Sequence, residues 1–372
     1  MSKILILSTV HHYQDARIFK EITSLKKNYS DINFMVRTEK ENDFIENGVK
    51  IISLPSTNSI IDRVKLQRLA WEKIKNLMPE IIHFHDPELI VLGFLVRKFM
   101  NIKIIFDIHE NISASFKDNV WLPRYLKPIL PFLYNRFEKF LIKKFNALII
   151  AETSYRQIYG SKPIEILNFP ILKRNIAEVK NFEEPISFVY TGVVWERRGI
   201  FQMLNLVDRL IKNGSNIKFN LVGQFVSGSL KSKVENFIVE HNLESVVQIY
   251  GRKTILEVYK ILEKSHVGLS LMKDIENYKE SLSSKIFDYM SMSIPYVVSD
   301  FEIYQKYTVE ANTGITVNYN DDDEIYDKTL KLISDKEKLK ELGNNGRIYS
   351  QNEWNWESQE IKLLNLYREL LK

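Results

Sequence analysis

The chain has 372 residues, of which 45% are hydrophobic and 27% charged, with a net charge of +5 and no cysteine. This length suits two globular domains, and the composition excludes a mainly disordered or fibrous chain. The lack of cysteine excludes disulfides, thiolate metal sites and a cysteine nucleophile, and it favours a cytoplasmic protein. No apolar run approaches the ~20 residues that span a bilayer, and we interpret the apolar N-terminus as a buried strand rather than a signal peptide.

Short apolar runs alternate with helical patterns along the first half of the chain. A helix is expected at 15–27, directly after the first run. Runs of β-branched and leucine residues with helices between them are typical of buried parallel strands joined in βαβ units. The runs expected to form strands are 4–8, 32–36, 49–52, 81–84, 103–107 and 147–151.

The pattern restarts after a charged, weakly patterned stretch. Helices are expected at 201–212 and 356–371. The expected strands are 186–191, 219–222, 247–249, 267–270, 296–299 and 314–317. We therefore predict an α/β fold with two doubly wound Rossmann-like domains that face each other across a cleft. The predicted boundaries are 1–168 for the N-terminal domain, 169–184 for a linker, 185–355 for the C-terminal domain and 356–372 for a helix that packs back toward the first domain.

Ligands of such sheets bind beyond the carboxyl ends of the strands, so polar residues that follow strands are the first candidates for a site. His12 lies just after the first strand. Asp15 is suited equally to capping the next helix and to a functional task. Arg17 lies in the first turn of that helix, where a cation opposes the helix dipole, and this favours a purpose other than helix stability.

Two histidines lie at the end of the strand at 81–84. Strand alternation places His83 and His85 on one face. Together with Asp86 they have the ligand types of a metal site, but Asp86 and Pro87 also suit the start of a helix. We favour the helix start because no matching second cluster is apparent, and we expect no bound metal.

A second polar group ends the strand at 103–107. Asp107 and His109 share a face there, and Glu110 follows. Polar groups at the end of a buried strand are costly without partners, which favours a function for them. A histidine in this position can donate a hydrogen bond to a substrate hydroxyl or stabilise developing charge.

The second domain carries a basic turn. Gly192 ends a strand, and Arg197 and Arg198 precede a helix; a turn with cations at a helix N-terminus is suited to binding phosphate. Neither G-x-G-x-x-G nor G-x-x-x-x-G-K-[ST] occurs, which counts against a dinucleotide fingerprint and a P-loop. A further helix is expected to begin near Lys285. Asp288 near its start either serves the helix dipole or accepts hydrogen bonds from a ribose diol, and the spacing leaves both open.

Taken together, these motifs resemble one known family. Residues 287–290 and 294–300 resemble the donor-site segment of GT-B glycosyltransferases, specifically the large retaining family 4, also called group 1. The resemblance implies a GT-B fold, a UDP- or GDP-sugar donor held by the second domain and an acceptor on the first. It also implies retention of anomeric configuration without a metal or other cofactor. Its further segments follow in order along the chain and are 12–17, 83–89, 107–110, 190–192, 198–199, 345–347, 355–357, Leu363 and Tyr367.

The resemblance also implies roles for single residues. The family's two acids separated by seven residues match Glu280, which would reach the donor sugar, and Asp288, which would bind the ribose. The family's donor-contacting histidine matches His109. The resemblance implies no protein nucleophile: the acceptor hydroxyl attacks from the face that the diphosphate leaves, and a diphosphate oxygen takes the proton.

The family's basic diphosphate pair is only half present. Arg198 matches one position, and Val193 stands at the other. We expect Arg197 or Lys285 to supply the missing charge close to Gly192. The residues expected on the acceptor side of the cleft are His12, Asp15, Arg17, His85, Asp107 and Glu110.

The segment 121–144 combines basic and aromatic residues. It holds six lysines and arginines against one acid, Glu138. This mixture suits a peripheral contact with the inner face of the cytoplasmic membrane, and an ordinary amphipathic helix packed on the domain is the alternative. No nucleic-acid partner is expected, because the overall charge is mild and no binding motif occurs.

The leading hypothesis is a glycosyltransferase that adds a sugar to a glycan or polyprenyl-linked acceptor in surface polysaccharide synthesis. Fold does not determine function, so a nucleotide-sugar epimerase on the same scaffold is the first alternative. A non-catalytic subunit that binds sugar nucleotides is the second. The departures from the family pattern at Val193 and Asp288 motivate that second alternative.

Overall fold

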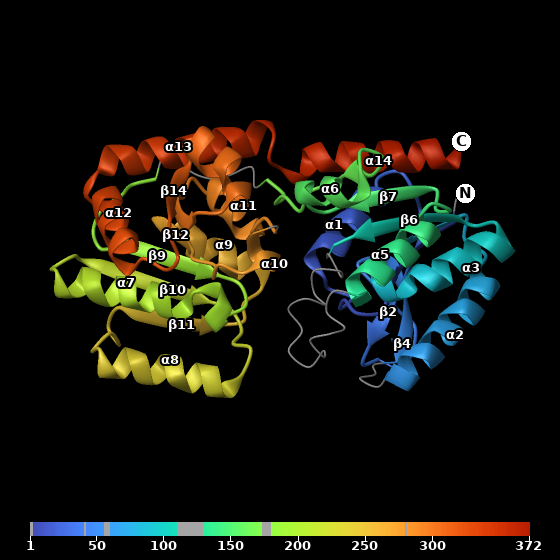
Figure 1. Cartoon of the computed structure of the whole chain (residues 1–372), viewed down its shortest axis with the longest axis horizontal. Coiled ribbons are helices and arrows are strands. Elements are labelled where there is room, and N and C mark those ends of the chain that lie inside the picture. Colours follow the sequence, from blue (N-terminus) through green and yellow to red (C-terminus); the bar gives the residue numbers. More distant parts are fainter. Residues whose placement is uncertain (1–2, 41, 56–59, 110–128, 173–179, 280) are drawn as a thin grey trace. The chain divides into compact units, whose positions relative to one another are not determined.

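The computed structural model describes residues 3–40, 42–55, 60–109, 129–172, 180–279 and 281–372. The chain divides into two compact units, one formed by Met1–Asn168 with Trp356–Lys372 and the other by Phe169–Asn355. Each unit contains one sheet with helices packed against it (Figure 1).

The first unit is built on an eight-stranded sheet in the order β3-β4-β2-β1-β5-β6-β7-β8. Its strands are parallel, except that β3 runs antiparallel to β4. The strands are β1 Lys3–Ser8, β2 Asp31–Thr38, β3 Phe44–Glu46, β4 Val49–Pro55, β5 Ile81–Phe84, β6 Lys103–Ile108, β7 Ala147–Ile150 and β8 Ile164–Glu165.

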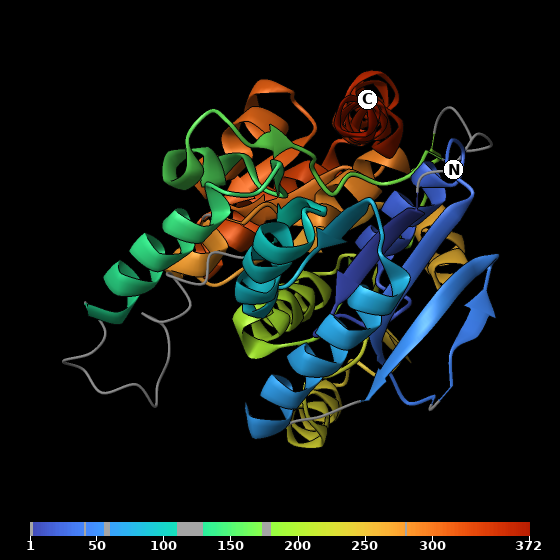
Figure 2. The same ribbon diagram turned by 90° about the vertical axis from the view of Figure 1, so that its right-hand side faces the viewer.

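Helices cover both faces of this sheet, because both faces of its strands are apolar. In β1, Ile4 and Ile6 pack toward α1 and α14, whereas Leu5 and Leu7 pack toward α2, α3 and α5. In Figure 2 the helices α2, α3 and α5 lie along one side of the sheet. The helices of this unit are α1 Ala16–Leu25, α2 Ile60–Leu77, α3 Ile90–Met100, α5 Ile129–Ile142, α6 Arg156–Tyr159 and α14 Trp356–Leu371, with short 3-10 turns η1 Pro87–Leu89 and η2 Thr153–Tyr155.

The second unit is built on a six-stranded parallel sheet in the order β11-β10-β9-β12-β13-β14. Its strands are β9 Ile186–Thr191, β10 Ile217–Val222, β11 Val247–Gly251, β12 Val267–Ser270, β13 Tyr296–Ser299 and β14 Gly314–Val317. Its helices are α7 Ile200–Lys212, α8 Gly228–Glu240, α9 Ile255–Glu263, α10 Glu276–Lys279, α11 Ser284–Ser291, α12 Asp322–Ser334 and α13 Lys336–Asn352. Its short helical turns are η3 Glu196–Arg198, η4 Glu302–Tyr304 and η5 Gln305–Glu310.

The predicted α/β class with two doubly wound sheets is confirmed. Five strands (β5, β9, β12, β13 and β14) and helix α14 have the predicted bounds. The sequence analysis missed β3 and β8, which have three and two residues and lie at the two edges of their sheet. Such short edge strands contain too few residues for an alternating pattern.

Helix α14 packs against α1 within the first unit. The indole Nε1 of Trp356 donates a hydrogen bond to Ser24 at 2.8 Å, and Ser24 donates to Glu360 at 2.9 Å. Leu363, Leu366 and Tyr367 complete the buried face of α14. The last residues of the chain therefore belong to the core of the unit in which the chain begins.

No helix among the residues that the structure describes is both long enough and apolar enough to cross a membrane.

Candidate functional site

The doubly wound topology marks one position in each unit for a site. In the first unit the strand order reverses between β1 and β5, and in the second between β9 and β12. Ligands of open α/β sheets bind beyond the carboxyl ends of the strands at such switch points. The polar residues that follow β1, β5 and β6, and those that follow β9, are therefore described in turn.

A buried polar cluster lies at the carboxyl ends of β5 and β6, on the face that α1 and α14 cover. His83 and Asp107 share that face with Ile81 and Ile105, as strand alternation requires. Arg17 and Glu21 approach from α1, where the i,i+4 spacing puts both side chains on one helix face. We call these four residues, together with His85, His109 and Tyr367, the histidine cluster.

An ion pair between Arg17 and Asp107 anchors the cluster. Arg17 Nε lies 2.9 Å from Asp107 Oδ2 and Nη2 lies 3.0 Å from Oδ1, while Nη1 donates to the carbonyl of Ile166 at 2.9 Å. Both side chains are at most 5% exposed. Burial alone would raise the pKa of Asp107, but Arg17 and His109 outweigh it and hold this pKa well below its usual range. Asp107 is therefore an anion.

Glu21 lies in the same cluster, but its charge state differs. Burial raises the pKa of Glu21 well above its ordinary value, and the neighbouring Asp107 anion raises it further. Arg17 Nε at 3.2 Å from Oε1 does not offset this. Burial and Asp107 thus favour the protonated form of Glu21, while Arg17 and Asp107 balance each other's charge.

The histidines of the cluster contact one another. His85 Nδ1 lies 3.0 Å from His109 Nε2, and His83 Nδ1 lies 2.9 Å from the hydroxyl of Tyr367. Burial lowers the pKa of His85 to about 4 and that of His83 well below its ordinary value, so both rings are neutral. His109 is 14% exposed, whereas His83 and His85 are fully buried. Only His109 therefore offers an edge to a ligand.

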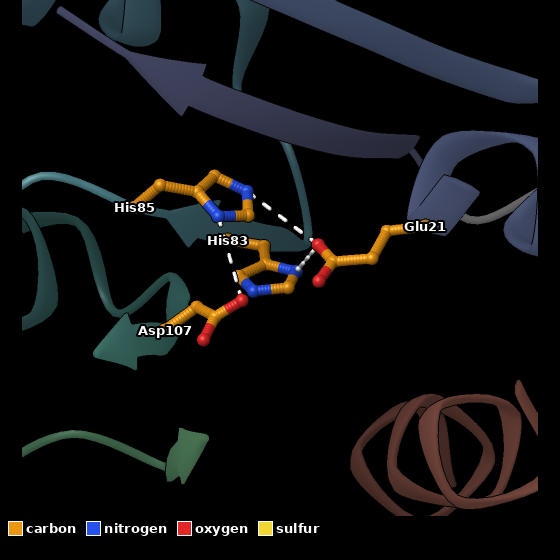
Figure 3. A group of neighbouring side chains, drawn as sticks. All are labelled: Glu21, His83, His85 and Asp107. Atoms are coloured by element: carbon orange, nitrogen blue, oxygen red, sulfur yellow. Dashed lines mark ion pairs between the residues drawn. The ribbon is translucent and has the colours of Figure 1, made fainter. Parts of the chain in front are cut away.

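Four of these residues have the types of metal ligands. Glu21, His83, His85 and Asp107 each offer an atom within 4.8 Å of the others (Figure 3). However, Glu21 Oε2 faces Nε2 of the His85 ring at 3.6 Å, and Asp107 Oδ2 faces Nδ1 at 3.5 Å, so the two acids lie at different nitrogens of one ring. The guanidinium of Arg17 already lies against both carboxyl groups. This set therefore does not fit a metal ion.

A separate polar group surrounds Asp86, which does not join the two histidines before it. Asp86 Oδ2 accepts from Ser8 Oγ at 2.8 Å and from the amides of Thr9 and Val10 at 2.5 and 3.1 Å. His11 Nδ1 lies 2.9 Å from Oδ1. Burial opposes ionisation of Asp86, but these donors hold its pKa at about 2. Asp86 thus ties the loop after β1 to the end of β5.

The residues expected on the acceptor side lie in different environments. Arg17, His85 and Asp107 are buried in the histidine cluster, where Arg17 pairs with Asp107 and His85 Nδ1 lies 3.5 Å from Asp107 Oδ2. Asp15 caps α1 by accepting from the amides of Arg17 and Ile18 at 3.0 and 3.1 Å. His12 is exposed, and its ring lies 4.2 Å from that of Tyr13. Glu110 lies outside the described residues.

Three members of this region, Glu21, Tyr367 and His11, were not chosen as site residues from the sequence. Glu21 lies in the expected helix at a position that is common for exposed acids. The one indication of its role is that it follows Arg17 by four residues, the spacing of an ion pair on one helix face. Tyr367 comes from the far end of the chain. His11 lies next to the chosen His12, and its ring is the one near His109, at 5.2 Å.

In the second unit, two cations converge on the turn after β9. Gly192 has φ +119°, and a Cβ placed on it would lie 3.7 Å from Lys285 Cε and 3.9 Å from Arg198 Nη1. Gly199 ends η3 with φ +77°, and a Cβ there would lie 1.7 Å from the carbonyl oxygen of Leu271, so only glycine lets this turn approach the end of β12. The backbone thus brings Arg198 beside the start of α11.

Neither cation is neutralised by a carboxylate among the described residues. Lys285 Nζ donates to Ser283 Oγ at 3.1 Å and lies 5.1 Å from the ring centroid of Tyr190, and Nε of Arg198 is buried without a partner in the described part of the chain. Burial, with Arg198 next, lowers the pKa of Lys285 to about 7, and Asp288 acts in the opposite direction. Two adjacent cations that form no ion pair with a carboxylate of the described residues are an arrangement suited to an anion.

The other donor-side predictions have different outcomes. Arg197 is exposed, and its guanidinium lies 5.1 Å from the ring centroid of Trp195, so Lys285 rather than Arg197 stands beside Arg198. Asp288 is half-buried on α11. Glu280 lies outside the described residues and stays a prediction.

Comparison with known proteins agrees with this architecture. Residues 173–349 match the family described as glycosyl transferases group 1. An uncharacterized glycosyltransferase from Methanocaldococcus jannaschii is 28% identical over 174 residues, which cover 46% of this chain. The match spans about half the length of that relative, 47% of it.

Solved structures match over nearly the whole chain. Sucrose-phosphate synthase from Thermosynechococcus elongatus aligns with a TM-score of 0.78 at 16% identity, covering 100% of this chain and 99% of its own. HepE from Anabaena, in complex with UDP and glucose, aligns with a TM-score of 0.75 at 10% identity, covering 99% and 100%. At such identities the likeness shows the fold, which is GT-B. The whole chain therefore has the GT-B fold, and residues 173–349, which form most of the second unit, match the glycosyl transferases group 1 family.

Proposed function

We propose that this chain is a retaining glycosyltransferase that moves a sugar from a UDP- or GDP-sugar to a glycan or lipid-linked acceptor in surface polysaccharide synthesis. The observation that carries the proposal is the pair formed by Arg198 and Lys285 at Gly192, with no carboxylate partner among the described residues. A diphosphate would supply the missing negative charge.

The chemistry follows from that charge. When the bond between the sugar C1 and the diphosphate breaks, negative charge develops on the leaving oxygen, and cations held in place before the reaction stabilise it. The acceptor oxygen forms the new bond to C1 on the same face, and its proton passes to a diphosphate oxygen. Because Arg198 and Lys285 supply positive charge, we expect transfer without a metal ion.

The remaining donor roles are part of the same proposal. Asp288 would bind the ribose hydroxyls, Glu280 would reach the donor sugar, and the exposed edge of His109 would contact that sugar. HepE was solved with UDP and glucose, and WaaG is described as a glycosyltransferase involved in lipopolysaccharide biosynthesis; these likenesses support the donor class and the kind of product.

A membrane surface is the proposed location of the acceptor. Helix α5 buries Leu141 and Ile142 but leaves five large apolar side chains at least half exposed. Cationic side chains accompany them, and this combination favours the inner face of the cytoplasmic membrane. The first part of the predicted contact, 121–128, lies outside the described residues. The exposed apolar residues are Ile129, Phe132, Leu133, Phe137 and Phe140, and the nearby cations are Arg136, Lys139, Lys143 and Lys144.

A ligand screen followed by product analysis tests the function. A thermal shift is measured with UDP, GDP and their sugars, since a ligand at ~100 times its Kd stabilises by ~2.7 kcal/mol. The donor that binds is then incubated in EDTA, with and without polyprenyl phosphate, and its products are identified. Free nucleoside diphosphate together with a sugar of unchanged anomeric configuration is expected, and Arg198→Met should abolish the shift.

The alternatives have distinct outcomes in this experiment. An epimerised nucleotide sugar formed without acceptor would identify an epimerase. Binding without turnover, with or without Mg²⁺ or Mn²⁺, would identify a non-catalytic subunit. Turnover that EDTA abolishes and a divalent cation restores would contradict the metal-independent mechanism alone.

A further inference from the structure

The ring of His109 has two distinct sides. Its Nε2 lies 3.0 Å from Asp107 Oδ2 and 3.0 Å from His85 Nδ1, inside the histidine cluster. No described residue bonds its Nδ1, and the backbone carbonyl of His109 accepts from the hydroxyl of Tyr155 at 3.1 Å, which fixes the residue in place. Which nitrogen carries the hydrogen therefore decides what His109 offers to a ligand.

We propose that Asp107 is a positioning residue, which fixes the hydrogen of His109 on Nε2 and leaves Nδ1 as the atom that acts on substrate. This rests on the proposed function, in which His109 contacts the donor sugar. Asp107 itself is fully buried and touches no substrate.

The hydrogen positions follow from one anion. Asp107 carries no proton, so it can only accept hydrogen bonds. A lone pair on His109 Nε2 at 3.0 Å from that oxygen would be repelled, so Nε2 carries the hydrogen. His85 Nδ1 lies farther from the carboxylate, at 3.5 Å from Asp107 Oδ2, so the hydrogen between the two rings belongs to His109 Nε2. His85 Nδ1 then presents a lone pair to that N–H, which places the hydrogen of His85 on Nε2, on the side of Glu21.

The elements behind Asp107 make this arrangement rigid. Arg17 binds both oxygens of Asp107 and is itself held by the carbonyl of Ile166. The carboxylate therefore has one orientation, in which His109 Nε2 lies 3.0 Å and His85 Nδ1 3.5 Å from Oδ2.

A consequence for the reaction follows from Nδ1 of His109, which no residue in the described part of the chain bonds. When the ring is neutral, Nδ1 accepts a hydrogen bond from a hydroxyl, and when the ring is protonated, Nδ1–H donates one. An asparagine at 107 can turn its amide N–H toward Nε2, which would move the ring hydrogen to Nδ1 and reverse the polarity of the exposed edge.

The first experiment reads the hydrogen position directly. The protein has seven histidines, so selective ¹⁵N-histidine labelling gives a simple two-bond ¹H–¹⁵N spectrum, and His109→Gln assigns the signal. At mildly alkaline pH the wild type should show His109 with Nε2 protonated and Nδ1 bare. A wild-type His109 protonated on Nδ1 would overturn the proposal, whether or not any variant folds.

The second experiment compares Asp107→Asn with Asp86→Asn. Both remove a buried carboxylate at a strand end, but only Asp107 lies beside His109. We expect Asp107→Asn to move the His109 hydrogen and to lower kcat by ~10²-fold or more with an unchanged KM for the donor. Asp86→Asn should lower the Tm without moving the His109 signal. If both variants lost kcat equally, and in proportion to the fall in their Tm, Asp107 would contribute only to stability.

The two proposals fail separately. If the wild type turns over no nucleotide sugar, the proposed function fails. The ¹⁵N-histidine spectrum still tests whether the hydrogen of His109 lies on Nε2. If transfer occurs and Asp107→Asn retains wild-type kcat, the positioning role fails and the glycosyltransferase remains.

Discussion

The ring of His83 on β5 is hydrogen-bonded to the hydroxyl of Tyr367 on α14, with 2.9 Å between Nδ1 and the oxygen. Both side chains are fully buried, and 284 residues separate them in sequence. Burial raises the pKa of Tyr367 well above its ordinary value, so the phenol keeps its proton. The last helix is thereby joined to the strand that carries the histidine cluster.

Loss of this hydroxyl should destabilise the first unit. Tyr367→Phe leaves Nδ1 of His83 buried without its partner, and an unsatisfied buried group costs about 1–3 kcal/mol. Urea unfolding followed by circular dichroism gives the change in free energy of unfolding. As a control, Tyr326→Phe on α12 removes a hydroxyl from a partly buried ring and should change stability by about 0.5 kcal/mol or less. Equal effects of the two substitutions would contradict the prediction.

Removal of Arg17 should have a larger effect. Arg17→Met leaves the Asp107 carboxylate buried without its counter-ion, and breaking a buried pair in this way costs about 3–5 kcal/mol. The double variant Arg17→Met with Asp107→Leu should recover much of that loss, because it removes the unpaired charge as well. Arg63→Met breaks the more exposed pair with Glu88 and serves as the control, with an expected loss of about 0–1 kcal/mol. An Arg17→Met variant as stable as Arg63→Met would show that the buried ion pair contributes no more to the free energy of unfolding than the exposed one.

The local patterns of the sequence were sufficient to predict most strands, and they also predicted which residues end them. The alternation that puts His83 with His85, and Asp107 with His109, needs only a period of two. The partners of these side chains could not be predicted, because Glu21 and Tyr367 reach the cluster through helix packing, which depends on the tertiary fold. The complete burial of His85 and Asp107 depends on the same packing and could not be predicted from their position at strand ends.

Helix α5 should bind anionic lipid through its apolar residues. Phe140 is 62% exposed, and Phe140→Ser removes an aromatic group beside the cations at 143 and 144. Co-sedimentation with vesicles of phosphatidylglycerol and phosphatidylcholine should show weaker binding for this variant and little binding to phosphatidylcholine alone. Leu256→Ser on α9 removes an equally exposed apolar group, 64% exposed, and should bind like the wild type. Wild-type binding by Phe140→Ser, or no binding by the wild type, would remove α5 from the membrane proposal.

Asp288 should contribute to nucleotide binding. A carboxylate that accepts hydrogen bonds from hydroxyls contributes about 1.5–3 kcal/mol, so Asp288→Ala should weaken binding by about 10- to 150-fold. Asp288→Glu keeps the acceptor and restores the residue of the family pattern, and it should be tolerated. Isothermal titration with the nucleotide found in the ligand screen measures both. Unchanged nucleotide affinity in a folded Asp288→Ala variant would show that Asp288 does not bind the nucleotide and serves only to stabilise helix α11 through its dipole.

The affinity for a nucleotide sugar should fall as the pH rises above 7. Burial, with Arg198 next, lowers the pKa of Lys285 to about 7, so the free protein loses this charge above that pH. A bound diphosphate favours the protonated lysine, and binding therefore takes up a proton. The apparent Kd should rise by up to ~10-fold per pH unit above 7. The diphosphate of a nucleotide sugar has no proton that titrates near neutral pH, so the effect belongs to the protein.

The unliganded protein should show the opposite trend in stability. Because the pKa of Lys285 is about 7 when folded and 10.5 ordinarily, the unfolded chain binds more protons between these values, and the free energy of unfolding from this group rises with pH across that window. Lys285→Met should remove this contribution and weaken binding at every pH, whereas Lys285→Arg, which is always charged, should bind with little pH dependence. Calorimetry in two buffers of different ionisation enthalpy counts the protons taken up. A wild-type slope that persists in Lys285→Arg would mean that another group, and not Lys285, carries the proton.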